Sequence, residues 1–177
     1  MMFKITDSQS RTYRHDSKFV NGLNVISRPF LNDDVQVFFE GNGFYFYDIH
    51  TVIKQLQYFP NGLIYDAMIP RDAQVVGNRT DRMILSNPMS FETFIEKYNI
   101  QNDIVKYNGR LIKYIDAKTH EICVLAVENN GMALEFIDPI LQTNEICVKA
   151  IRQNGIALEH VDPLYVTEEL CMEACSS

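Results

Sequence analysis

The chain contains 177 residues, of which 46% are hydrophobic and 22% are charged, and a chain of this size and composition can bury a core without a metal or a disulfide. Its net charge of −7 at pH 7 argues against nucleic-acid binding, because proteins bind phosphates through clustered Lys and Arg. The sequence has neither an uninterrupted apolar stretch of about 18 to 20 residues nor the apolar core of a signal peptide, so we expect a cytosol-like compartment and no membrane association.

Residues 1 to 98 contain short runs of β-branched and aromatic residues, divided by Gly, Asn, Asp and Pro. Such runs are typical of β-strands joined by turns. The dipeptide Asn21-Gly22 predicts a tight turn, and Glu40 to Gly43 predicts the turn of a hairpin between two aromatic flanks. The expected strands lie at residues 2–6, 35–39, 44–47, 63–69, 73–76 and 81–85.

Two helices are predicted in the same part of the chain. Asp48 is a suitable N-cap for a helix over residues 49–58, in which four apolar residues share one face at the i, i+3, i+4, i+7 spacing. We expect this helix to lie on the sheet. Ser90 is a suitable N-cap for a helix over residues 91–98, which would join the sheet to the rest of the chain.

The remainder of the chain repeats itself. The segment Glu121 to Pro139 returns as Glu145 to Pro163 and opens a third time as Glu169 to Cys175, so equivalent residues lie 24 apart. A degenerate earlier copy, in which Asn108 to Asp116 matches the later Asn-Gly segment, begins near residue 99. A fixed period in this range is typical of stacked repeats, because one unit cannot bury its apolar face alone.

Each unit carries signals for where its helices begin and end. A Thr two residues before the repeated Glu predicts an N-cap, and the Glu is favourable in the first turn because of the helix dipole. We expect the helix to end at Asn-Gly, with Gly131 or Gly155 in the left-handed conformation. A second, shorter helix is expected over residues 132–137 and 156–161, followed by an Asp-Pro turn. The capping threonines are Thr119, Thr143 and Thr167.

Cysteine recurs three times at one position of the repeat. In the first full unit, Cys123 belongs to an apolar stripe that also contains Ile122, Ala126 and Val127, which predicts a small residue of the core. A disulfide or a zinc site is the alternative, but the spacing of the cysteines lacks a Cys-x-x-Cys motif. The four cysteines are Cys123, Cys147, Cys171 and Cys175.

The third unit stops after its first helix, at the sequence Cys175-Ser-Ser. Two interpretations stay open. Either this helix caps the array, or Leu170, Met172 and Cys175 are exposed and pack on a partner or on a second copy of the chain.

The repeated unit, Glu-Ile-Cys-Val-x-Ala-Val/Ile-x-x-Asn-Gly-x-Ala-Leu-Glu-x-Val/Ile-Asp, resembles a short helical repeat of unknown function that is abundant in giant viruses of the mimivirus type. The first part of the chain looks like a domain that precedes repeat arrays in the same viruses. This likeness rests on segments that include Phe19 to Asn24, Gly43 to Asp48, Ile69 to Val75 and Asp81 to Leu85.

The resemblance brings no catalytic residue and no cofactor. It implies a viral protein that acts in the host cytoplasm or in the virion through protein contacts. We therefore expect a host or viral protein partner, with homo-oligomerisation through the C-terminal helix as an additional route of association.

An enzymatic alternative comes from a second similarity. The order Gly43-Phe-Tyr-Phe-Tyr-Asp, then a helix, then Ile69-Pro-x-Asp-Ala-x-Val is similar to that of ADP-ribosyltransferase-like folds. Those enzymes hold NAD with an early His or Arg and use a late Glu, and no residue here occupies either position clearly. An active or a decayed transferase is the alternative function.

The remaining candidates for chemistry are weak. The four histidines share no metal-binding spacing, and no phosphate-binding loop or nucleophile elbow occurs. Charged residues of the repeats could form a recognition surface, although charges opposite an apolar stripe are commonly just solvated. The residues that we expect at an interaction surface are Glu128, Glu135, Arg152, Glu159, Leu170 and Met172.

These observations predict an α+β protein with an α+β domain over residues 1–89, ended by Pro88, and a helical repeat domain over residues 90–177. The function expected is a non-enzymatic protein-interaction module of a giant DNA virus. A virion structural component that assembles through its last repeat is a further alternative.

Overall fold

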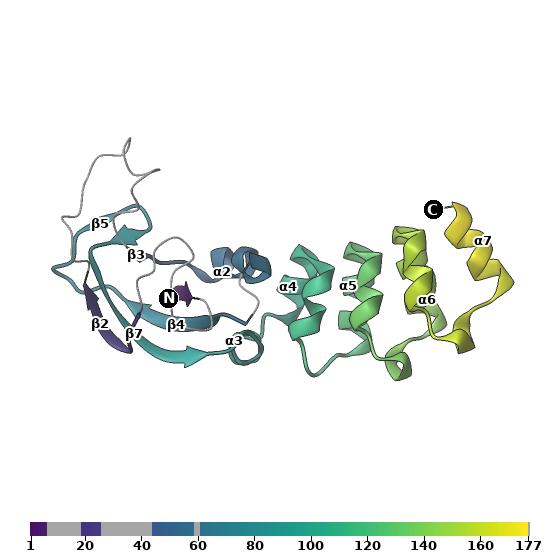
Figure 1. The fold of residues 1–177 in the computed structure, drawn as a ribbon, viewed down its shortest axis with the longest axis horizontal. Helices are drawn as coiled ribbons and strands as arrows, with labels where there is room; N and C mark the ends of the chain where they lie inside the picture. Colours follow the sequence, from purple (N-terminus) through teal and green to yellow (C-terminus); the bar gives the residue numbers. More distant parts are fainter. Residues whose placement is uncertain (7–18, 26–43, 59–60, 177) are drawn as a thin grey trace. The chain divides into compact units, whose positions relative to one another are not determined.

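The computed structural model describes residues 1–6, 19–25, 44–58 and 61–176. The chain divides into two compact units, Met1–Phe94 and Ile95–Ser177. The first contains sheets and the second only helices (Figure 1), so the predicted α+β class is confirmed. This division falls within a helix, and the domain boundary expected after residue 89 stays a prediction.

The first unit is built on a four-stranded antiparallel sheet with the order β1-β4-β7-β2. A smaller antiparallel sheet has the order β3-β6-β5. Its link to the larger sheet is a bridge in which Phe3 and Tyr47 exchange two backbone hydrogen bonds of 2.8 Å. The strands are β1 (Met2–Thr6), β2 (Gly22–Val25), β3 (Phe44–Tyr45), β4 (Leu63–Met68), β5 (Val75–Val76), β6 (Arg79–Thr80) and β7 (Arg82–Met89).

Helix α2 (Ile49–Gln55) continues into a 3-10 turn, η1 (Leu56–Tyr58), so the predicted helix over residues 49–58 is confirmed. Its predicted cap is also present, because the Asp48 carboxylate accepts a 2.7 Å hydrogen bond from the Thr51 N–H. This hydrogen bond lowers the pKa of Asp48. The apolar face of the helix is buried and packs on β1.

Helix α3 (Phe91–Tyr98) begins at Ser90, whose hydroxyl accepts a 3.3 Å hydrogen bond from the Thr93 N–H, as predicted. The Phe94 ring meets the Phe3 ring edge-on at 5.1 Å, which attaches the start of this helix to β1. A separate group of buried residues, Phe19, Tyr65, Met83 and Leu85, forms a core around β4 and β7.

The hairpin expected between residues 35–39 and 44–47 lies partly outside the described residues, and β3 pairs with β6. Pro88, expected to end the domain, is part of β7, which extends to Met89. The ladder is irregular opposite Pro88, with a register shift between Ile64 and Asp66, and such irregular positions tolerate a residue that has no N–H to donate.

The second unit contains four complete α-helices, which stand in a row (Figure 1). Each of the first three is followed by a 3-10 segment, and the degenerate first copy predicted near residue 99 is confirmed. The elements are α4 (Gln101–Tyr107), η2 (Gly109–Tyr114), α5 (His120–Asn129), η3 (Gly131–Phe136), η4 (Pro139–Leu141), α6 (Asn144–Gln153), η5 (Gly155–His160), η6 (Pro163–Tyr165) and α7 (Glu168–Ser176).

The start and the buried face of each helix follow the sequence signals. Each predicted capping threonine accepts a hydrogen bond from the N–H three residues later, at 3.1 to 3.3 Å. In α5 the buried residues are the predicted stripe of Ile122, Cys123, Ala126 and Val127, and in α6 the same four repeat positions are buried.

The Asn-Gly junction differs from the prediction. Among the described glycines only Gly22 and Gly77 have a positive φ, so Gly131 and Gly155 do not end the helix in a left-handed conformation. Instead Asn130 is extended, with φ −152°, and its side chain accepts a 3.1 Å hydrogen bond from the Met132 N–H. The expected second helix is therefore a 3-10 segment that starts at the glycine itself.

The glycine is required for a different reason, which is contact with the next unit. A Cβ at Gly131 would lie 2.2 Å from the Ala150 carbonyl oxygen of α6, and equivalent Cβ atoms at Gly109 and Gly155 would lie 2.1 and 2.3 Å from carbonyl oxygens of α5 and α7. The Gly109 N–H also donates a 2.8 Å hydrogen bond to the Asn129 side chain of the next helix. Only a hydrogen atom fits between these backbones.

We predict that Gly131→Ala separates α6 from η3. The added methyl group overlaps the Ala150 carbonyl, so the variant should lose about 1 to 3 kcal/mol of stability or more. Thermal unfolding followed by circular dichroism measures the loss.

Gly155→Ala is the matched variant, because its methyl group would meet Ala174 of α7 in the same way. It should expose the amides of α7 to hydrogen exchange while those of α5 stay protected, since α7 is the last helix of the row. A Gly131→Ala protein as stable as the wild type would contradict the close-approach argument.

Candidate functional site

The charged residues expected at an interaction surface are largely engaged in pairs between successive units. Glu128 of α5 pairs with Lys149 of α6, and Arg152 of α6 pairs with Glu173 of α7 at 2.8 Å. Glu135 of η3 is held by Arg110 of η2 at 2.9 Å. Exposed pairs of this kind contribute about 0 to 1 kcal/mol each, so they add little to the stability of the array.

The other three residues expected at the surface differ in their exposure. Glu159 and Met172 are exposed, and 59% of Met172 is accessible. Leu170 is only 4% exposed, so the expectation that it lies on the surface is wrong. It occupies the repeat position of the buried Ile122 and Ile146, and its helix α7 packs against both α6 and η5.

The two most exposed aliphatic residues of the array are not among the residues predicted for the surface. Ile140 in η4 is 86% exposed and Leu164 in η6 is 88% exposed. They lie 24 residues apart, so they occupy the same position of the repeat, directly after the Pro of each Asp-Pro turn. The repeat alignment contains this signal, although an Asp-Pro motif by itself predicts only a connecting turn.

Both turns are fixed by side-chain caps and by a buried amide. The carboxylates of Asp138 and Asp162 accept hydrogen bonds from the N–H of Ile140 and of Leu164, at 3.0 and 2.8 Å. Gln142, only 3% exposed, follows η4 directly and accepts a 2.8 Å hydrogen bond from the Asp162 N–H. The two exposed aliphatic residues are therefore carried by turns that are bonded to each other.

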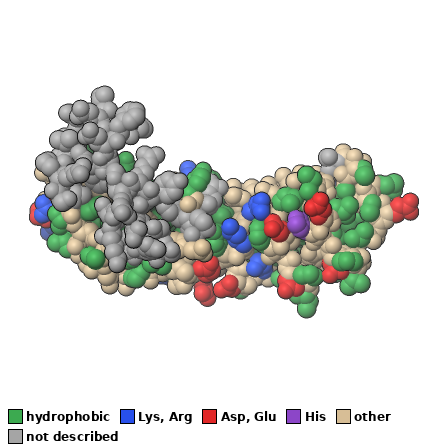
Figure 2. All heavy atoms as spheres, viewed as in Figure 1, with side chains coloured by type: hydrophobic (Ala, Val, Ile, Leu, Met, Phe, Trp, Pro, Cys, Tyr) green, Lys and Arg blue, Asp and Glu red, His purple; other side chains and the backbone are tan. Residues whose placement is uncertain are grey.

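The surroundings of these turns are acidic. Each turn leads into the next helix, whose first turn includes Glu145 in α6, which also faces Lys149 and His120, and Glu168 and Glu169 in α7. The connections run along the lower edge of the row of helices (Figure 1). Along this edge, Figure 2 shows hydrophobic side chains interspersed with acidic ones.

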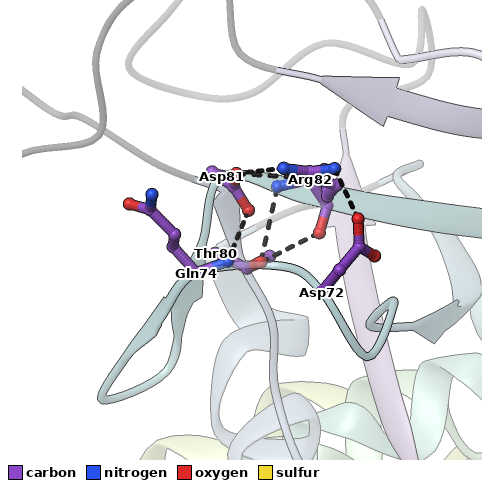
Figure 3. Close-up of polar contacts among 5 residues, drawn as sticks. All are labelled: Asp72, Gln74, Thr80, Asp81 and Arg82. Carbon is purple, nitrogen blue, oxygen red and sulfur yellow. Dashed lines mark hydrogen bonds and ion pairs between the residues drawn. The ribbon is translucent and has the colours of Figure 1, made fainter.

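In the first unit, five polar residues form a connected cluster around the turn that precedes β7 (Figure 3). Arg82 pairs with Asp72 at 3.0 Å and with Asp81 at 3.2 Å, and the hydrogen bond with Asp81 raises the pKa of Arg82. Asp81 also accepts a 2.9 Å hydrogen bond from the Gln74 N–H, and Thr80 donates to the Arg82 carbonyl. These contacts pair the polar groups with one another, and the cluster thereby stabilises the turn.

The first unit also contains a buried amine whose pKa is lowered. Lys4 on β1 is 3% exposed, and its amine lies 4.9 Å from the centre of the Phe19 ring. Burial lowers the pKa of Lys4 to about 7, because the charged ammonium loses its hydration. A fraction of Lys4 is therefore neutral near neutral pH.

The cysteines are free. Cys123 and Cys147 are fully buried, as predicted for core residues, whereas Cys171 is half-buried and Cys175 is exposed. Burial raises the pKa of Cys123 and raises that of Cys147 to about 11. These two thiols stay protonated at neutral pH, and a protonated thiol is a poor nucleophile.

In the part of the chain that the structure describes, no three His, Cys, Asp or Glu side chains are grouped so as to hold a metal ion. Over the same residues, no helix combines the length and the apolarity needed to cross a bilayer.

Comparisons with known proteins bear on the repeats alone. Residues 99–142 and 119–170 each match the model of a family described as "Domain of unknown function (DUF4116)". The first match begins just before α4, in agreement with the degenerate first copy. No curated protein and no solved structure matches the chain. Neither the match nor the described residues indicate a catalytic activity.

We predict that Lys4→Met changes how stability depends on pH. Between about pH 7 and the ordinary lysine pKa of 10.5, the unfolded chain binds a proton that the folded chain releases, so wild-type stability rises with pH in this window. Lys4→Met removes this rise, and below pH 7 it should be more stable than the wild type by an amount on the order of a few kcal/mol.

Denaturant unfolding at several pH values, followed by circular dichroism, measures the difference. Lys54→Met, at an exposed lysine of the same unit, controls for the loss of a positive charge. A difference between Lys4→Met and the wild type that stays constant from pH 6 to pH 10 would contradict a buried amine with a pKa near 7.

Proposed function

We propose that this protein is a non-enzymatic interaction protein whose stacked repeats recognise another protein. The observation that carries the proposal is the repeated exposure of an aliphatic side chain on the capped turns η4 and η6. Stacked repeats present one continuous surface, and exposed apolar side chains held in fixed positions are typical of protein recognition. The function requires no cofactor.

The resemblance to giant-virus repeats supplies the biological setting of this proposal. The protein would act in the host cytoplasm or in the virion and would bind a host or viral protein. The acidic chain supports a protein ligand over a nucleic acid, because its net charge of −7 repels phosphates.

We expect the full chain, tagged and expressed in infected host cells, to retain a specific partner in affinity capture with mass spectrometry. A chain truncated after Tyr98, which lacks α4 to α7, should lose that partner. Circular dichroism of the truncated chain must show a folded sheet for the comparison to count.

Other outcomes point elsewhere. A partner retained equally by the truncated chain would assign binding to the first unit. Capture of the chain's own copies alone, with assembly that depends on concentration, would favour a structural component of the virion. Turnover of NAD by the purified chain would favour the ADP-ribosyltransferase alternative.

A further inference from the structure

The geometry points to a docking edge, formed by η4 and η6, that binds a basic amphipathic α-helix of a partner protein. This inference rests on the proposed function and names the surface and the chemistry of its ligand. The docking edge is defined by Ile140 and Leu164, with Asp138, Asp162, Glu168 and Glu169 beside them.

The two turns that carry Ile140 and Leu164 are rigid. In each turn a Pro fixes the first position and the preceding Asp binds the N–H of the aliphatic residue. The Asp138 carbonyl also accepts a 2.8 Å hydrogen bond from the Leu141 N–H, and the Asp162 carbonyl accepts one of 2.9 Å from Tyr165. A ligand that covers Ile140 and Leu164 therefore orders little backbone when it binds.

The Gln142 side chain links the two turns. The Gln142 side chain donates hydrogen bonds to the Ile137 carbonyl at 3.3 Å and to the His160 carbonyl at 3.0 Å, and it accepts one from the Asp162 N–H. Its equivalents in the neighbouring units are Lys118 and Val166, which have no such amide. This cross-link therefore joins η4 to η6 and fixes the separation of the two exposed residues.

The distance between Ile140 and Leu164 sets the spacing of the apolar residues that a ligand must present. Packed helices stand about 8 to 10 Å apart, so equivalent residues of successive units are separated by about that distance. Residues i and i+7 of an α-helix are about 10 Å apart along one face. A helix lying across the units can therefore place apolar residues against both Ile140 and Leu164, with an i+3 or i+4 residue between them.

The charge of the docking edge favours a basic ligand. The carboxylates of Asp138, Asp162, Glu168 and Glu169 make the local charge of this edge negative, so its potential attracts Lys and Arg that flank the apolar face of a ligand. The same potential repels the anionic surface of a membrane. A basic protein helix satisfies both the apolar and the electrostatic requirement.

The test uses the full chain and a labelled synthetic peptide of about four helical turns, with Leu at i, i+3, i+4 and i+7 positions and Lys elsewhere. Fluorescence anisotropy measures binding. The double variant Ile140→Asn/Leu164→Asn keeps the charge of the chain and changes two side chains that are 86% and 88% exposed, so the fold should persist. We expect its affinity for the peptide to fall by roughly tenfold or more.

Ile156→Asn is the matched control, because Ile156 is an aliphatic residue of η5 that is 61% exposed and lies outside the docking edge. It should bind the peptide like the wild type. A peptide with Glu in place of Lys should bind more weakly, and affinity for the basic peptide should fall as salt is raised.

Three results would overturn the docking edge. They are equal peptide binding by the double variant and the wild type, equal binding of the acidic and the basic peptide, and binding to vesicles of anionic lipid in preference to the peptide. Self-association of the chain that the double variant abolishes, without peptide binding, would overturn it in favour of a second copy.

Repeating the affinity capture with the double variant separates this inference from the proposed function. A partner that the wild type and the double variant retain equally upholds the interaction function and overturns the docking edge. A partner lost by the double variant and retained by Ile156→Asn supports both. If the wild type retains no partner the proposed function fails, and the peptide measurement alone decides whether the edge binds a basic helix.

Discussion

The close approach of a glycine to the carbonyl of the next helix is the constraint on which the repeat array depends. At Gly109, Gly131 and Gly155 a single methyl group would come within 2.3 Å of a backbone oxygen, so this contact sets how near successive units can stand. The residue on the helix side of the contact is also small. Ala126 and Ala150 occupy equivalent positions there and are fully buried. The apolar stripes of successive units come into contact because the backbones approach each other closely at these glycines.

This spacing separates two classes of residue. Positions that face the neighbouring unit are confined, and they hold nearly the same side chains in each copy. Positions outside the stack are free to change. Between α5 and α6 the pair is Glu128 with Lys149, whereas between α6 and α7 the basic residue comes first, as Arg152 with Glu173. The reversed order makes each interface distinct, although the buried stripe is shared.

The turns η4 and η6 belong to this outer class, yet both carry a large aliphatic residue in solvent. A polar residue would cost nothing there, since neither Ile140 nor Leu164 is covered by the fold. Scattered exposed apolar residues are normal on proteins, but here the repetition, the Asp caps and the Gln142 cross-link hold two of them in a fixed relation. That arrangement is the reason why we propose this edge as a recognition surface.

The first unit accommodates its polar groups in two ways, by pairing at partly exposed positions and by burial of a single amine. Arg82, Asp81 and Asp72 are paired around one turn, whereas Lys4 is enclosed beside an aromatic ring at the cost of a lowered pKa. The cluster around Arg82 stabilises a local connection. The Lys4 amine instead couples the stability of the sheet to pH.

The sequence by itself determined the local elements: the period of 24, the threonine caps, the buried stripe and the helix after Asp48. These follow from interactions within a few residues, which periodicity and capping rules describe. Tertiary structure alone decided the role of Gly131, the burial of Leu170, the continuation of β7 through Pro88 and the pairing of Glu128 and Arg152. Each of these depends on a neighbour that lies about one repeat away, or on a partner strand. For Ile140 and Leu164, the sequence shows that the two residues occupy equivalent positions of the repeat. Their exposure, in contrast, follows only from how the units stack.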